Sequence, residues 1–339
     1  MNLTTTYLGL DLRNPLVASP SPLARTVDGV RRLAGAGVAA VVLPSLFEEE
    51  LRREAERDAQ LTDLGTDSFN EASSYLPPAS DGAGGSRRYL SLLERAAAAV
   101  DIPVIASLNG VTAGGWVDHA TAMQDAGAAA IELNVYDQPG GPRTTGRDVE
   151  QRHLDILARV KAAVTVPVAI KLSPYFSSTM EMALRLDQAG ADGLVLFNRF
   201  MQPDIDLETL AVTAPVWLST PDEARLPRAW IALLRGRVRA SLAATTGVEN
   251  AEDVVKYLLA GADVVMTTSA LLRHGPEHAA TLLDGLTEWM NRKQFTAVGE
   301  LRGLLCAPPV ADPSHDRRAG YLAAVQEATN LYGARWARR

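Results

Sequence analysis

Cysteine is almost absent from this sequence, which contains a single one, Cys306. One cysteine cannot form an intramolecular disulfide, and it cannot supply the thiolates of a cysteine-rich metal site or an iron–sulfur cluster. Long apolar stretches are also missing, because no run approaches the roughly 20 residues that a membrane-spanning helix needs. Residues 1–13 lack the basic-then-apolar order of a signal peptide. These absences predict a protein of the reducing cytoplasm with no membrane partner.

An excess of basic residues is missing as well. The 339 residues include 40 acidic and 33 basic side chains, with a formal net charge of −7, so the overall field does not favour nucleic acid. Hydrophobic residues make up 47% and charged residues 22%, the balance of a globular protein with a large core. A single barrel of alternating strands and helices often reaches this length. We therefore expect one domain over 1–339.

A repeated pattern organises the chain. Four times a helix-like stretch ends in a small-residue cluster and passes into an apolar run, with C-cap glycines expected at Gly37, Gly127, Gly190 and Gly261. Four further segments have the same strand character, namely NPLVASP, PVIASLN, PVAIKLS and SLAATTG. The eight expected strands cover 14–20, 39–45, 103–109, 129–135, 167–173, 193–199, 241–247 and 263–270.

Helical patterns separate these strands, for example at 115–127, 149–165, 177–190 and 250–261. Such alternation produces a parallel sheet with right-handed crossovers, and eight units close a barrel. The predicted fold class is therefore α/β, a (β/α)₈ TIM barrel, with a doubly wound open sheet as the alternative. Three segments fall outside the repeat: a long loop insertion at 46–86, an excursion at 217–221 and a helical C-terminal extension at 315–339.

Polar residues end several of the apolar strands. Asn109, Asn134, Lys171 and Asn198 close four consecutive strands, and the C-terminal strand ends of such a barrel form its active site. Buried amide and ammonium groups need polar partners, so these residues predict a polar ligand at the mouth. Solvent at an open mouth would also satisfy them. A single asparagine is weak evidence, because Asn often ends a strand through its turn chemistry.

The turns after the last two strands have the composition of a phosphate site. TTGVENAED and TTSALLRHG follow these strands, where barrels commonly bind phosphate through loop amides and a helix N-terminus. Gly247 allows the backbone to approach an anion closely, and Thr268 and Ser269 offer hydroxyl and amide donors. Asn250 is expected to cap the helix that follows the first turn. Two ordinary strand-to-helix turns are the alternative interpretation.

The segments TYLGLDLRNPLVASPSPL, IELNV, VPVAIKLSP, GLVLFN and TTGVENAEDVVKYLLAGADVVMTTSALL resemble the dihydroorotate dehydrogenase family, in the same order over residues 3–285. The short N-terminus resembles the class 1 enzymes of that family, which are not membrane-associated. The resemblance implies a barrel with FMN across its mouth that transfers hydride between the flavin and a C–C bond of a small polar substrate, dihydroorotate/orotate or a related compound. We also expect a homodimer. The electron acceptor stays open between fumarate, a quinone, NAD through a partner subunit, and oxygen.

The resemblance also implies roles for individual residues. Lys171 would lie at the pyrimidine edge of the flavin, where its charge stabilises the reduced ring. The expected cofactor-binding residues are Ala18, Ser19, Asn109, Asn134, Lys171, Asn198, Thr246, Gly247, Thr268 and Ser269. The expected substrate-binding residues are Asn70, Asn134, Asn198 and Arg199.

The chain departs from the family's pattern at the catalytic loop. The family's base follows the motif Asn-Leu-Ser-Cys-Pro-Asn, whereas residues 134–139 of this chain read Asn-Val-Tyr-Asp-Gln-Pro. Asp137 stands at the base position and Tyr136 directly precedes it, so the catalytic candidates are Asp137, Tyr136 and Lys171. Asp137 is equally suited to a turn in DQPGG.

A second departure affects the substrate contacts. Pro44 replaces a lysine of the family that contacts flavin and substrate, and Pro139 replaces an asparagine that holds orotate. Arg199 and Arg143 partly offset the missing lysine, because a guanidinium matches a carboxylate in bidentate geometry.

Two alternative functions stay open. A flavin-free barrel lyase or isomerase would use Lys171 as a Schiff-base amine on a phosphorylated substrate. A catalytically inactive flavin-binding homologue would account for the altered loop at 135–141. The visible absorbance of the purified protein separates the first alternative from a flavoprotein.

Overall fold

The structure is a computed structural model that describes residues 1–53, 85–110, 116–137, 139–200, 202–213, 217–308 and 313–336. The chain divides into one compact unit, residues 1–306, and a second unit, residues 307–339, which contains helix α12 (Pro313–Trp336). This helix occupies the segment where the sequence predicts a helical extension. Most of the predicted insertion at 46–86, with Asn70, lies outside the described residues. That 1–339 is a single domain stays a prediction.

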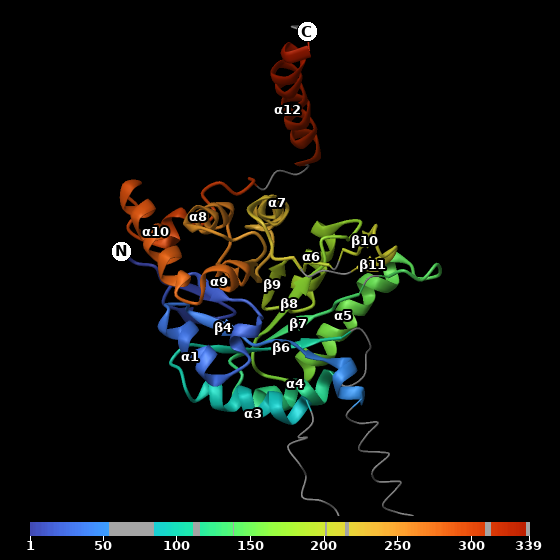
Figure 1. The fold of residues 1–339 in the computed structure, drawn as a ribbon, viewed down its shortest axis with the longest axis vertical. Coiled ribbons are helices and arrows are strands. Elements are labelled where there is room, and N and C mark those ends of the chain that lie inside the picture. Colours follow the sequence, from blue (N-terminus) through green and yellow to red (C-terminus); the bar gives the residue numbers. More distant parts are fainter. Residues whose placement is uncertain are drawn as a thin grey trace, which may run out of the picture. The chain divides into compact units, whose positions relative to one another are not determined.

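Eight parallel strands form a closed barrel in the first unit (Figure 1). Each barrel strand pairs with the barrel strand that follows it in the chain. The first of them also pairs with the last, and this contact closes the ring. The barrel strands are β3 (Leu16–Ala18), β4 (Ala40–Val42), β6 (Val104–Asn109), β7 (Ala130–Asn134), β8 (Val168–Leu172), β9 (Gly193–Leu196), β12 (Ser241–Ala244) and β13 (Val264–Thr267). A short strand, β5 (Leu46–Phe47), also pairs with β6. The predicted (β/α)₈ barrel is confirmed, and the closure excludes an open sheet.

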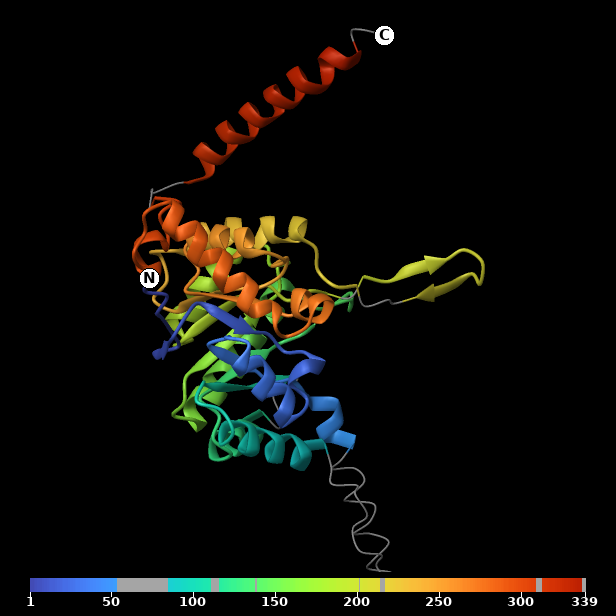
Figure 2. The same ribbon diagram turned by 60° about the vertical axis from the view of Figure 1, so that its left-hand side comes forward.

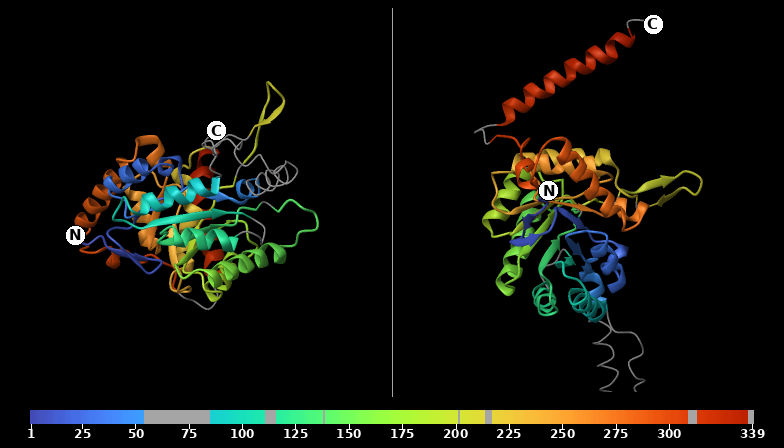
Figure 3. Two further views of the ribbon diagram at one scale, coloured as in Figure 1. Left: turned by 90° about the horizontal axis from the view of Figure 1, so that it is seen from below. Right: turned by 90° about the vertical axis from the view of Figure 1, so that its left-hand side faces the viewer.

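Helices connect successive strands and surround the barrel, as Figure 1 and Figure 3 show. They are α1 (Val27–Gly35), α3 (Gly85–Ala97), α4 (Trp116–Asp125), α5 (Gly146–Ala163), α6 (Thr179–Gln188), α7 (Arg225–Leu234) and α8 (Ala251–Ala260), followed by α9 (Ser269–His274), α10 (His278–Arg292) and α11 (Val298–Leu301). The cap predicted for α8 is confirmed, because the Asn250 side chain accepts a hydrogen bond from the Asp253 N–H at 3.2 Å. At its other end Gly261 adopts φ +119°, a left-handed conformation that suits glycine.

Two apolar layers explain why the strands read as continuous hydrophobic runs. Side chains such as Ile105, Val195 and Met266 fill the barrel, while the outward-facing ones pack against the helices. The N-terminal hairpin of β1 (Thr5–Tyr7) and β2 (Leu10–Leu12) adds Leu8 to the inner layer. Its N–H donates to Ser241 Oγ, at the start of β12, at 3.1 Å. The hairpin therefore covers the N-terminal end of the barrel, opposite the mouth.

The connection between β9 and α7 differs from the prediction. The sequence predicts an excursion at 217–221, but the structure also contains an antiparallel hairpin of β10 (Asp204–Asp206) and β11 (Ala211–Thr213). Figure 2 shows this hairpin projecting away from the barrel. A 3₁₀ turn, η3 (Pro221–Ala224), then leads into α7. Strands of three residues are too short to show a recognisable alternation, which is why the pattern missed them.

Candidate active site

The C-terminal mouth of the barrel brings the predicted amide and lysine side chains together. Asn109 pairs in register with Asn134, and Asn134 with Lys171, on the adjacent strands β6, β7 and β8. Register partners in a parallel sheet face the same side, here the inside of the barrel. The Asn198 Nδ2 group, just after β9, donates to Asn134 Oδ1 at 2.6 Å. Four residues predicted from four separate strands therefore form one polar cluster.

A buried carboxylate lies one layer below this cluster. Glu132 precedes Asn134 by two residues on β7, so its side chain also points into the barrel. It is 1% exposed, and its Oε1 lies 3.5 Å from Lys171 Nζ. Neither carboxylate oxygen has a hydrogen-bond partner among the described residues. Sequence reasoning missed Glu132, although a glutamate within the apolar run AAAIELN was a signal, because buried charges need partners.

The turn after β12 has an unusual backbone. Thr246 and Gly247 have φ values of +81° and +71°, which are strained for threonine and accessible to glycine. Hydrogen bonds hold this turn: Tyr257 of α8 donates its hydroxyl to Thr246 O at 2.7 Å, and Thr246 Oγ1 donates to Phe197 O at 3.3 Å. Burial raises the pKa of Tyr257, so its hydroxyl remains a donor at ordinary pH.

Ser219 joins the two turns that the sequence predicts as a phosphate site. Its Oγ accepts a hydrogen bond from the Gly247 N–H at 3.2 Å and lies 2.9 Å from Ser269 Oγ. Its own N–H donates to Ser269 Oγ at 3.0 Å. Thr268 Oγ1 donates to Ser19 O at 3.0 Å, which connects β3 to the same cluster. The sequence marked the segment of Ser219 as an excursion but gave no signal that this side chain reaches the site.

Arg273 of α9 fixes Ser219 from outside the cluster. It donates to Ser219 O at 2.7 Å and also forms an ion pair with Glu249. Burial alone would raise the pKa of Glu249, but the hydrogen bonds from His274 and Arg273 outweigh burial, and the net pKa is below its usual value. Glu249 is therefore charged near neutral pH. Through Ser219, Glu249 and Arg273, these contacts connect the loops after β9, β12 and β13.

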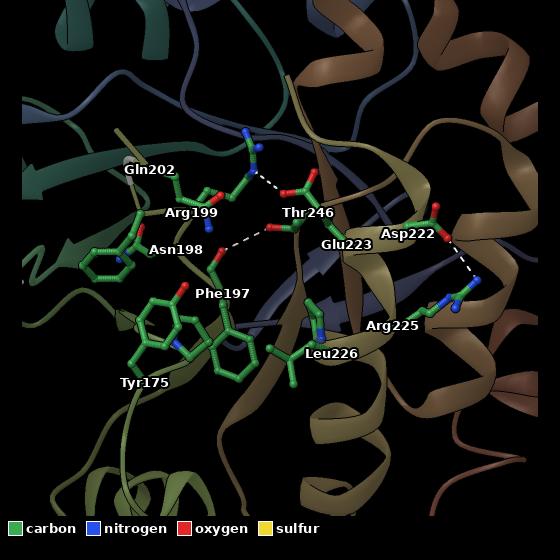
Figure 4. Close-up of a pocket in the computed structure, with 13 residues that line it drawn as sticks. Tyr175, Phe197, Asn198, Arg199, Gln202, Asp222, Glu223, Arg225, Leu226 and Thr246 are labelled. Carbon is green, nitrogen blue, oxygen red and sulfur yellow. Dashed lines mark hydrogen bonds and ion pairs between the residues drawn. The ribbon is translucent and has the colours of Figure 1, made fainter. Parts of the chain in front are cut away.

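A cavity of about 300 Å³ lies beside the ends of β9 and β12. Figure 4 shows Asn198, Arg199 and Thr246 on its wall, together with the rings of Tyr175 and Phe197. The Arg199 side chain forms an ion pair with Glu223 at 2.9 Å and donates to the Trp217 carbonyl. Arg199 therefore lines the cavity, and part of its donor capacity is already used within the protein. Its role as a substrate contact stays a prediction.

The loop after β7 gives its two catalytic candidates different surroundings. The Tyr136 ring stacks on Phe200, with the centroids 4.6 Å apart and the planes 16° from parallel. Asp137 forms an ion pair with Arg152 of α5 and lines a second cavity, of about 280 Å³. Asp137 therefore has a structural partner, and both catalytic assignments stay predictions.

The remaining predicted residues lie around the same mouth or apart from it. Ala18 is the last residue of β3, directly precedes Ser19 in the sequence and is buried. Pro44 follows β4 closely, so no cation stands at that position. Arg143 is exposed in the loop before α5 and does not join the cluster. Across the described residues, no group of three or more His, Cys, Asp or Glu side chains could hold a metal ion.

Comparison with known proteins gives a consistent result. The family model described as dihydroorotate dehydrogenase matches residues 2–290. The catalytic subunit of dihydroorotate dehydrogenase B (NAD(+)) from Methanothermobacter thermautotrophicus is 27% identical over 310 residues, which cover 89% of this chain and 98% of that protein. The corresponding subunit from Halalkalibacterium halodurans is 29% identical over 212 residues, 60% of this chain and 68% of that protein. Dihydroorotate dehydrogenase A (fumarate) from Limosilactobacillus reuteri is 30% identical over 210 residues, 59% of this chain and 68% of that protein.

Proposed function

Because this chain belongs to the dihydroorotate dehydrogenase family, we propose that it is an FMN-dependent oxidoreductase acting on a C–C bond of a small polar substrate, dihydroorotate/orotate or a related compound. One observation carries the proposal beyond family membership. The amide and lysine cluster on β6 to β9 and the hydroxyl cluster at the turns after β12 and β13 lie at the same end of one barrel. A flat polar ring with a phosphate tail would use both clusters.

The residues at the mouth fit FMN. Ser19 Oγ is buried and has no hydrogen-bond partner among the described residues, so it can serve a polar ring. At Gly247 an added Cβ would lie 2.7 Å from both Thr220 O and Ala224 N, so the converging backbones require glycine there. Hydroxyls and backbone amides near a helix start are the donors that phosphate prefers. We therefore assign the turns to the phosphate and the amide cluster to the ring.

Binding and orientation are the tasks of the chain's own residues. When bound, FMN would supply the redox chemistry, accepting or giving hydride at its ring. The Asn134 and Asn198 amides hold each other at 2.6 Å and keep further donors and acceptors for ring or substrate. The Lys171 ammonium places a positive charge at the floor of the mouth, where it stabilises negative charge that develops during the reaction. Tyr136 or Asp137 would transfer the substrate proton.

The Schiff-base alternative is less well supported. A nucleophilic lysine must be a neutral amine, and burial among apolar groups or beside another cation favours that form. Lys171 instead has an acidic neighbour, since its Nζ lies 3.5 Å from Glu132 Oε1. The inactive-homologue alternative predicts bound flavin that no donor reduces.

We expect the protein to purify yellow with one noncovalent FMN per chain. Gly247→Ala should weaken FMN binding, because the added Cβ crowds the turn against Thr220 and Ala224. Gly236→Ala is the matched control: Gly236 has a similar φ of +78° but no atoms within 4 Å of a Cβ. Absorbance spectra and FMN titration of the apoproteins measure the effect. A colourless protein that takes up no added FMN would contradict the proposal.

A homodimer is the assembly that we propose. The β10–β11 hairpin exposes Ile205, Leu207, Leu210 and Val212 by 64–83% and is a separate two-stranded sheet. Strand edges and apolar side chains of this kind favour pairing with a second copy around a two-fold axis. None of the helices in the described part of the chain combines the length and apolar character needed to cross a bilayer. A cytoplasmic location is part of the same proposal.

Val212→Lys is expected to shift the protein from dimer to monomer, because it places a charge in the apolar surface of the hairpin. Leu304→Lys, at another exposed leucine of the same unit, should leave the dimer intact. Sedimentation velocity over a range of concentrations measures both. A wild-type monomer at every concentration, or a dimer that survives Val212→Lys, would rule out this interface.

A further inference from the structure

Lysine is rare in this protein, and one of its few lysines lies in the barrel. Only Lys161, Lys171, Lys256 and Lys293 occur among the 33 Lys and Arg residues. Lys171 is 12% exposed by its side chain, whereas the side chains of Lys161 and Lys256 are 30% and 48% exposed. A charge that is buried to this degree is costly unless an opposite charge lies nearby.

The negative charge that faces Lys171 is Glu132. The carboxylate is almost fully buried, and its Oε1 lies 3.5 Å from Lys171 Nζ. A distance of 3.5 Å allows a charge pair without a short hydrogen bond, and both carboxylate oxygens lack other partners among the described residues. The pair is therefore mutually dependent, because removing either charge would leave the other one buried and uncompensated.

Other titratable groups near this pair do not replace Glu132. Tyr7 of β1 and Tyr89 of α3 interact with the Glu132 charge, but burial raises the pKa of both phenols and Glu132 adds to the effect, so they are neutral. At the rim Asp137 is paired with Arg152, and Arg199 with Glu223.

We infer that Glu132 is a positioning residue that compensates the buried charge of Lys171 and holds its ammonium at the floor of the mouth. The part of this inference that concerns flavin rests on the proposed function; the charge pair itself does not. Water at an open mouth also solvates the Lys171 ammonium. A bound ring would exclude this water, so the ammonium would then depend more strongly on Glu132.

The test follows the Hε–Cε NMR signals of the protein labelled with ¹³C-lysine, since four lysines give four assignable signals. In the apoprotein, Glu132→Gln should lower the titration midpoint of Lys171 relative to wild type, because the ammonium loses its paired anion. Lys171→Arg identifies the signal, and Glu132→Asp should restore most of the wild-type midpoint. Asp192→Asn is the matched control: Asp192 pairs with Lys161 at 2.6 Å outside the barrel and also accepts the Val168 N–H at 2.7 Å, which an amide oxygen can still accept. Among the lysines, this variant should therefore change Lys161 alone. An unchanged Lys171 midpoint in Glu132→Gln would overturn the inference.

The same question can be asked if Glu132→Gln does not fold. In Lys171→Met the Glu132 carboxylate is left buried without its cation, so this variant should lose stability as pH rises and the carboxyl ionises. Lys171→Arg keeps a cation and should not show this loss. Identical pH profiles of thermal stability for the two variants would contradict the pairing.

With FMN added, the flavin reduction potential gives a second measurement. In Glu132→Gln, Lys171 should lose its proton at a lower pH than in wild type. At alkaline pH the variant should therefore have a lower flavin reduction potential than wild type. A potential that changes with pH in parallel in both proteins would contradict the role toward flavin. Failure of all variants to bind FMN would instead contradict the proposed function, while the lysine titration of the apoprotein still decides the role of Glu132.

Discussion

On the proposed FMN-dependent function, Lys171→Ala is expected to slow flavin reduction by about 10²–10³-fold, the usual effect of removing one electrostatic donor from a catalytic site. Lys171 is the register partner of Asn134 on the adjacent strand β7, and its ammonium lies 3.5 Å from the Glu132 carboxylate below. Stopped-flow measurement of flavin reduction by dihydroorotate, or by whichever substrate works, gives the rate. Lys161→Ala is the control, since it removes a lysine from an ion pair outside the barrel.

Stability must be separated from chemistry in this experiment. Lys171→Ala leaves the Glu132 carboxylate buried without a cation, which typically costs about 3–5 kcal/mol of unfolding free energy. The double variant Lys171→Met with Glu132→Gln removes both charges, so it should recover most of that stability while reduction stays slow. If the double variant recovers the rate together with the stability, Lys171 has only a structural role. An unaffected single variant would show that the site lies elsewhere.

The barrel could be predicted because each of its units repeats a local signal. Gly37, Gly127, Gly190 and Gly261 all have positive φ values at helix ends, as the sequence pattern indicates. Strand ends were less well placed: the segment 263–270 was predicted as one strand, but β13 ends at Thr267 and α9 begins at Ser269. Thr268 and Ser269 have apolar residues before and after them in the sequence, so no change in the hydrophobic pattern marks the end of the strand.

The site was predictable only where strand ends determine it. Asn109, Asn134, Lys171 and Asn198 meet because parallel strands bring their ends to one mouth. Ser219 reaches the same region through contacts 28 and 50 residues away along the chain, with Gly247 and Ser269. A serine in a connecting segment carries no periodicity that would reveal such contacts. The partners of Arg199 and Asp137 are hidden for the same reason, since each ion pair joins segments that are distant in sequence.

Replacing the residue that transfers the substrate proton should slow flavin reduction by about 10²–10⁴-fold while FMN stays bound. Tyr136→Phe keeps the ring that stacks on Phe200 and removes only the hydroxyl. Asp137→Asn keeps the shape of the side chain and removes the charge that pairs with Arg152. The two variants therefore test the two candidates with little change in packing, and the loss should fall on one of them.

The pH dependence identifies which residue is the base. If Asp137 accepts the proton, the rate of substrate oxidation should climb as its carboxyl ionises, Asp137→Asn should abolish the climb, and Tyr136→Phe should change little. If neither substitution slows reduction, the loop is a turn, as DQPGG also suggests, and the proton passes to water or to the segment 46–86.

If dihydroorotate reduces the flavin at no pH, Pro44 and Pro139 account for the failure, and the substrate should be sought among other small unsaturated acids or amides.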